Sequence, residues 1–75
     1  MFYTIKAQIY EGDESGFVAE CLELPIVTQG QTIDEVIKNL REAITLHLEG
    51  EDLAALGFAP HPPIVINYEM ESVCA

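Results

Sequence analysis

The junction at Thr32 constrains the fold of this chain more than any other feature of its sequence. Thr32 is followed three residues later by Glu35, directly before a run in which apolar residues recur every three or four positions. In such a capping box the Thr hydroxyl accepts a hydrogen bond from a backbone N–H of the first helical turn, and the Glu carboxylate can accept one from the N–H of the Thr. We therefore expect a helix that begins at Ile33 and runs to about Glu49, with Gly50 as a left-handed cap.

The apolar positions within this helix predict that one of its faces is buried. They are Ile33, Val36, Ile37, Leu40, Ile44 and Leu48. Positions three and four apart lie on the same side of a helix, so these side chains form a single stripe. The helix is therefore expected to pack against another layer of the structure through this stripe.

Two segments upstream of the helix alternate apolar and polar side chains, which is typical of half-buried strands. They span residues 2–10 and 16–22, with the turn-forming residues 11–15 between them, and this predicts a β-hairpin with a five-residue loop. Because residues directly opposite each other share a face, the apolar pattern restricts the register. The register expected from this pattern and from the charges pairs Ile9 with Phe17, Ala7 with Ala19, and Lys6 with Glu20.

Two further strands complete the predicted sheet. A short strand from Ile26 to Gln29 follows Pro25, and a strand from Ile64 to Tyr68 follows a proline-rich connector. The first three strands form an antiparallel meander, and the helix returns the chain so that the last strand lies beside the first. The expected fold class is α+β, with the element order β-β-β-α-β, a four-stranded mixed sheet in the order 3-2-1-4 and one main helix on one face.

The face of the sheet opposite the helix has no predicted cover. Its apolar residues are expected to be Phe2, Tyr10, Val18 and Leu22, together with one face of the last strand. An apolar sheet face left bare usually marks a contact surface. Two copies of the chain can stack through this face, so we expect a homo-oligomer. The alternative is that residues 51–60 fold back over it.

The charge of the chain excludes some classes of partner and favours others. Residues 1–75 are expected to form one domain, with 13 acidic and 3 basic side chains and a formal net charge of −10. Such a surface repels phosphate backbones and attracts basic proteins, so we expect no direct binding of nucleic acid. The acids expected to pair with a basic partner are Glu11, Asp13, Glu14, Glu20 and Glu23, although solvation alone also explains each of them.

Nothing in the sequence predicts a membrane or secreted location. No apolar run approaches the roughly 18 residues of a membrane-spanning helix, and the first residues lack the basic start and apolar core of a signal peptide. We therefore expect a cytoplasmic protein in which Cys21 and Cys74 are both thiols. The last residues, 71–75, are expected to fray.

The sequence does not predict a catalytic or metal-binding site. A metal-dependent nuclease needs several acids that converge on two ions from rigid elements, but the centre of the first strand, residues 5–8, has no acid. Neither His47 nor His61 has metal-ligand spacing to a cysteine, and there is no glycine-rich phosphate loop. We expect no catalytic residues, no cofactor and no metal site, and hence no enzyme activity.

Three segments of the chain carry a family resemblance. They are residues 16–25, 28–35 and 39–44, and their matching positions are Gly16, Leu24, Pro25, Gln29, Gly30, Thr32, Glu35 and Ala43. Together they resemble the HicB antitoxin family and its stand-alone HicB-like relatives. The resemblance implies a partial ribonuclease H-like fold without catalytic function. It also implies that this domain binds and occludes a small basic ribonuclease toxin, HicA, of a type II toxin–antitoxin system.

The sequence departs from the family pattern in two ways. Ile26 and Val27 stand where relatives often carry Gly and a small residue, and residues 1–75 contain no segment that predicts the DNA-binding domain found in many members. Two functions follow as hypotheses: an antitoxin domain with a HicA-type partner, or a stand-alone homo-oligomeric scaffold or small-ligand-binding module without a toxin. The first predicts a salt-sensitive complex with a basic protein, and the second predicts self-association alone.

Overall fold

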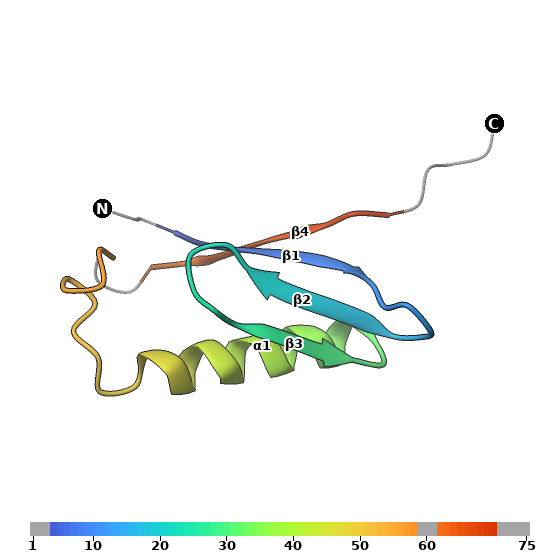
Figure 1. The fold of residues 1–75 in the computed structure, drawn as a ribbon, viewed down its shortest axis with the longest axis horizontal. Helices are drawn as coiled ribbons and strands as arrows, with labels where there is room; N and C mark the ends of the chain where they lie inside the picture. The colour runs from blue at the N-terminus through green and yellow to red at the C-terminus, as the bar shows by residue number, and fades with distance from the viewer. Residues whose placement is uncertain (1–3, 59–61, 71–75) are drawn as a thin grey trace.

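Four strands and one helix make up the described part of the chain, residues 4–58 and 62–70 of a computed structural model (Figure 1). In chain order they are β1 (Ile5–Glu11), β2 (Phe17–Cys21), β3 (Val27–Gly30), α1 (Ile33–Leu48) and β4 (Ile64–Tyr68). The predicted order β-β-β-α-β and the α+β class are confirmed. Residues 2 and 3 of the first predicted strand, and the predicted frayed end at 71–75, lie outside the described residues.

The four strands form one mixed sheet in the order β3-β2-β1-β4, as predicted. β2 pairs antiparallel with both β1 and β3, and β4 pairs parallel with β1. Figure 1 shows β3 and β4 at opposite edges of the sheet, with α1 on the β3 side. The helix lies over β2 and β3, away from β4. One face of the sheet is therefore covered unevenly, and the opposite face has no layer over it in the described residues.

The predicted register of the hairpin is wrong by two residues. Ile9 lies opposite Ala19 rather than Phe17, Ala7 lies opposite Cys21 rather than Ala19, and Glu20 lies opposite Gln8 rather than Lys6. A shift of two keeps every side chain on its predicted face, because the side chains of a strand alternate with a period of two. The apolar pattern therefore could not separate the two registers.

The hairpin turn selects the observed register. Gly16 has a φ of 74°, and the N–H of Gly12 donates to the carbonyl of Gly16 at 3.0 Å, which closes the loop over residues 12–16. The positive φ favours glycine at this position. The expected charge pair of Lys6 with Glu20 does not form. Instead the backbone N–H of Lys6 donates to Oε1 of Glu23 at 2.7 Å.

The core lies between the sheet and the helix. The helix contributes Val36, Leu40 and Ile44, which are buried, and Ile37 and Leu48, which are partly buried against them. The other buried apolar residues are Ile5, Ala7, Ile9, Ala19, Cys21, Leu24, Ile26 and Phe58. The predicted stripe is confirmed at its centre, while Ile33 at the first turn is only half-buried.

The Thr32 hydroxyl bond of the predicted capping box and the predicted Gly50 cap are both present. Oγ1 of Thr32 accepts a hydrogen bond from the N–H of Glu35 at 3.0 Å, and Thr32 itself is extended. This bond satisfies one of the N–H groups that the first turn leaves without a helical partner. At the other end Gly50 has a φ of 76°, as expected for a left-handed cap.

Residues 51–58 pack on the helix side of the sheet. They form a series of turns, and Phe58, only 2% exposed, joins the same buried cluster as Ile5 and Leu40. The alternative that this segment folds back over the opposite face is therefore wrong for the described residues 51–58, while 59 and 60 lie outside them. In the described ranges no helix has the length and hydropathy needed to cross a bilayer.

Candidate functional site

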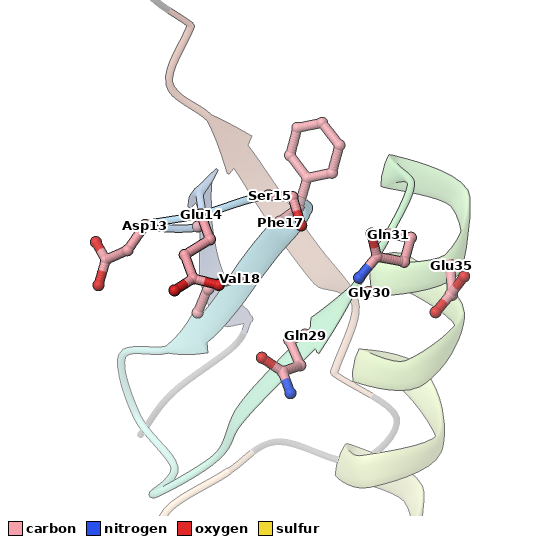
Figure 2. Close-up of a pocket in the computed structure, with 10 residues that line it drawn as sticks. Asp13, Glu14, Ser15, Phe17, Val18, Gln29, Gly30, Gln31 and Glu35 are labelled. Carbon is pink, nitrogen blue, oxygen red and sulfur yellow. The ribbon is translucent and has the colours of Figure 1, made fainter.

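A groove lies where three stretches of backbone meet at one end of the sheet. The β1–β2 loop forms one side, the first turn of α1 forms the other, and the end of β3 forms the floor (Figure 2). Its volume is about 640 Å³. The lining residues are Gly12, Asp13, Glu14, Ser15, Phe17, Val18, Gln29, Gly30, Gln31 and Glu35.

Glycine allows this close approach of the three segments. A Cβ atom on Gly30 would lie 2.7 Å from the backbone nitrogen of Val36, and one on Gly16 would lie 2.6 Å from the carbonyl oxygen of Gly30. Both distances are shorter than carbon tolerates against a backbone atom, so any larger residue would push the segments apart. The groove therefore depends on Gly16 and Gly30, two of the positions on which the family resemblance rests.

The charge of the groove is negative. Asp13 and Glu14 come from the hairpin loop and Glu35 comes from the first turn of α1, on opposite sides of the groove in Figure 2, and all three are exposed. None of the three basic residues of the chain lines it. Carboxylates at such a surface accept charge-assisted hydrogen bonds from Lys and Arg side chains, and Arg can bind them with two parallel bonds.

The structure brings together two of the five acids predicted to bind a partner. Asp13 and Glu14 line the groove, but Glu11 lies outside it at the end of β1. Glu20 accepts a hydrogen bond from the hydroxyl of Tyr10 at 3.2 Å, and Glu23 accepts the Lys6 N–H described above. These last two carboxylates already have partners within the chain.

Sequence reasoning missed Glu35, which it treated only as part of the helix cap. The predicted topology contained the signal that was needed. In an antiparallel meander the first hairpin loop and the end of the third strand lie at the same end of the sheet. The first turn of the helix after that strand must therefore lie near the loop. This places Glu35 across the groove from the loop that carries Asp13 and Glu14.

Two side chains near these acids have raised pKa values. Partial desolvation raises the pKa of the exposed Tyr10 hydroxyl, and the hydrogen bond and charge of Glu20 and then the charge of Asp13 raise it further. Burial likewise raises the pKa of the Cys21 thiol, with a smaller contribution from the charge of Glu23. Both groups therefore stay neutral over a wider pH range than they would in water.

The residues predicted for self-association lie where they were expected, as far as they are described. Tyr10 and Val18 are opposite each other on the face away from α1, and Leu22, directly after β2, is 63% exposed. Phe2 lies outside the described residues. The same face also carries polar residues, among them Gln8 and Glu20, so its apolar area is interrupted.

Candidate metal ligands are dispersed. In residues 4–58 and 62–70 no group of three or more His, Cys, Asp or Glu side chains is placed to hold a metal ion. Cys21 carries a free, buried thiol, while His47 is exposed in the last turn of α1. Cys74 and His61 lie outside the described residues.

The groove offers hydrogen-bond acceptors and negative charge, and this arrangement suits the binding of cationic side chains. Comparison with protein-family models, curated proteins and solved structures finds no match to this chain. Its function therefore has to be argued from its fold, its surface and the resemblance of its sequence segments.

Proposed function

We propose that this chain is a cytoplasmic HicB-like antitoxin domain that binds a small basic ribonuclease toxin of the HicA type and neutralises it by occlusion. The observation that carries the proposal is the acidic groove between the hairpin loop and α1, within a chain of net charge −10. The β-β-β-α-β fold and the segments that resemble the HicB family support it. No catalytic step by this chain is needed.

The mechanism follows from charge. A ribonuclease carries basic side chains that bind the phosphates of its RNA substrate, and the same side chains are attracted by a strongly acidic protein. Asp13 and Glu14 lie on one side of the groove and Glu35 on the other, so a basic segment that docks across it can pair with carboxylates on both sides. A toxin held in this way cannot present those residues to RNA.

The groove is a better candidate than the other predicted acids. Glu23 is half-buried and holds the backbone of Lys6, and Glu20 holds the hydroxyl of Tyr10. Using either carboxylate to bind a partner would cost the hydrogen bond that it already makes. Asp13, Glu14 and Glu35 are exposed and line the same groove, so pairing them with a basic partner mainly replaces water.

A charge-matched pair of variants tests this assignment. The groove variant combines Asp13→Asn, Glu14→Gln and Glu35→Gln, and the control combines Glu42→Gln, Glu49→Gln and Glu51→Gln. Each set changes the net charge from −10 to −7. The control acids are exposed and lie in the second half of α1 and just after it. Gln at position 35 keeps the capping pattern of the helix.

The measurement is the affinity of each variant for the basic protein that the unaltered chain captures from a lysate of its source cells and releases at high salt. The groove variant should bind about tenfold more weakly, as expected for the loss of three exposed charge pairs worth about 0.5 kcal/mol each. The control should differ from the unaltered chain by less than about threefold. If both variants lost the same affinity for the basic protein, the groove assignment would be contradicted, and the loss would reflect net charge alone. Capture of nothing but the chain itself would instead favour the self-associating scaffold.

A further inference from the structure

The two edges of the sheet differ in how they are protected. At the β3 edge the carbonyl oxygen of Gln29 accepts a hydrogen bond from Nδ2 of Asn39 at 2.8 Å, and α1 lies alongside. At the other edge, β4 pairs with β1 on one side, and on its outer side no strand or helix lies beside it in the described part of the chain. Figure 1 shows this second edge far from the helix.

The hydrogen bonds of β4 identify which of its backbone groups face away from the sheet. The N–H of Ile5 donates to the carbonyl of Pro63 at 2.9 Å, and the N–H of Glu69 donates to the carbonyl of Ile9 at 3.2 Å. In a parallel pair, alternate residues direct both backbone groups to the neighbouring strand. Residues 63, 65, 67 and 69 therefore face β1, and the N–H and carbonyl groups of Ile64, Ile66 and Tyr68 point outward from the edge.

The side chains of β4 include none of the residues that usually prevent another strand from pairing with an open edge. Its sequence, Ile-Val-Ile-Asn-Tyr, has no charge, no proline and no glycine. Natural proteins usually protect an open edge with a charged residue, a proline, a bulge or a covering element, because an unprotected edge pairs with another strand. An uncharged edge is notable in a chain of net charge −10.

We propose that β4 pairs antiparallel with β4 of a second copy, about a two-fold axis at Ile66, to form a continuous eight-stranded sheet. In this register Ile66 lies opposite Ile66 of the partner subunit, and Ile64 lies opposite Tyr68 of the partner subunit. These are the residues whose backbone groups point outward, so each pair exchanges two N–H···O bonds. The proposal does not depend on the proposed function.

Charge favours a second copy over a basic partner at this edge. Two copies repel each other over most of their surface, but the paired segments are uncharged, and Glu69 would lie opposite Pro63 of the partner subunit rather than opposite another acid. A basic protein would find no carboxylate on β4 to pair with. The uncharged edge is thus a place where identical chains can meet without direct like-charge contact.

The partial burial of the β4 side chains also favours pairing with a second copy. Ile64, Ile66 and Tyr68 lie on the helix side of the sheet but remain only partly buried, because α1 covers β2 and β3 instead. Side chains of paired residues lie on the same face of a sheet. Pairing would therefore bring the two rows together and bury further apolar surface. Both acidic grooves would stay accessible, since none of their residues belongs to β4.

Hydrogen exchange and molar mass together test this proposal. Sedimentation should give twice the chain mass of 8.3 kDa. The amides of Ile64, Ile66 and Tyr68 should exchange slowly, although residues 4–58 and 62–70 of the same chain give them no hydrogen-bond partner. A monomer at millimolar concentration would overturn the proposal. So would a dimer in which these three amides exchange as fast as those of exposed loops, because the copies would then meet elsewhere, for example through Tyr10 and Val18.

A proline variant with a matched control adds a second test. Ile66→Pro removes an outward N–H while leaving the bonds to β1 in place, so it should give a folded monomer of 8.3 kDa. Ile66→Ala truncates the side chain but keeps the N–H, so it should still dimerise, more weakly. Circular dichroism checks the fold of both. A folded Ile66→Pro variant that dimerises as well as the unaltered chain contradicts the proposal; if that variant does not fold, the exchange experiment decides alone.

Discussion

Gly30 is the residue on which the groove depends most directly. It is the last residue of β3, two residues before the Thr32 cap of α1, and the backbone of Glu35 and Val36 fills the space that a side chain would need. At the same end Gly16 approaches the carbonyl of Gly30. One glycine from the hairpin loop and one from the end of β3 therefore let the loop, β3 and α1 meet.

The variant Gly30→Ala should destabilise the fold by about 1–3 kcal/mol, the usual cost of overpacking a tight site. The new Cβ would lie 2.7 Å from the nitrogen of Val36, a backbone atom that cannot rotate away. Gly50→Ala is the control, since a Cβ there meets no atom within 4 Å and only its φ of 76° is unfavourable. The midpoint of urea denaturation measures both. Equal losses in the two variants would show that crowding at Gly30 is not the cause.

Cys21 should be a slow, inert thiol. Burial, and then the charge of Glu23, raise its pKa in the folded chain, so little thiolate is present to react. The pKa of the Cys21 thiol is higher in the folded chain than in the unfolded chain. The stability that the protonated thiol contributes is therefore complete below the unfolded pKa of about 8.5, and it is lost as the pH rises through the folded pKa. In a Cys74→Ser variant, iodoacetamide at about pH 8 should label Cys21 far more slowly than it does in urea. Equal rates in the two states would contradict its burial.

At the scale of the elements, the helix cap links the fold to the groove. Thr32 accepts the N–H of Glu35 and so fixes the first turn of α1, from which Glu35 lines the groove. A frayed first turn would no longer hold Glu35 at the side of the groove. The cap therefore contributes both to stability and to the shape of the groove.

Thr32→Ala should lower the free energy of unfolding by about 1 kcal/mol, the usual cost of losing a Thr cap. Thr45→Ala, at an exposed position inside α1, should be neutral or slightly stabilising, because Ala has the higher helix propensity. Thermal denaturation followed by circular dichroism compares the two. A cap variant as stable as the Thr45 variant would mean that the 3.0 Å bond to Glu35 is not formed in solution.

Much of the element structure could be predicted from sequence, because strong local signals agreed. The cap at Thr32, the helical stripe and the β-branched run from Ile64 to Tyr68 each matched an observed element. The hairpin register could not be predicted, since a period-two pattern is unchanged by a shift of two and the turn geometry at Gly16 decided between the choices. The groove also required contacts between segments distant in sequence, so Asp13 and Glu14 were found and Glu35 was not.

At the scale of the whole molecule, charge and sheet geometry assign different roles to different regions. The acidic groove lies at the hairpin end and beside α1, while the uncharged strand β4 forms the opposite edge. A dimer through β4 would carry two grooves that remain open to partners. Two linked grooves would bind a partner with two matching sites more tightly than either groove alone.

An antitoxin domain must inhibit a ribonuclease, and RNA cleavage by the captured basic protein tests the proposed function most directly. Cleavage should fall to background when this chain is added at about one copy per toxin, at about 50 mM salt, and should recover at about 500 mM salt, where charge pairing is screened. The toxin alone at each salt concentration is the control. Cleavage that persists in the presence of excess chain at low salt would contradict the proposed antitoxin function.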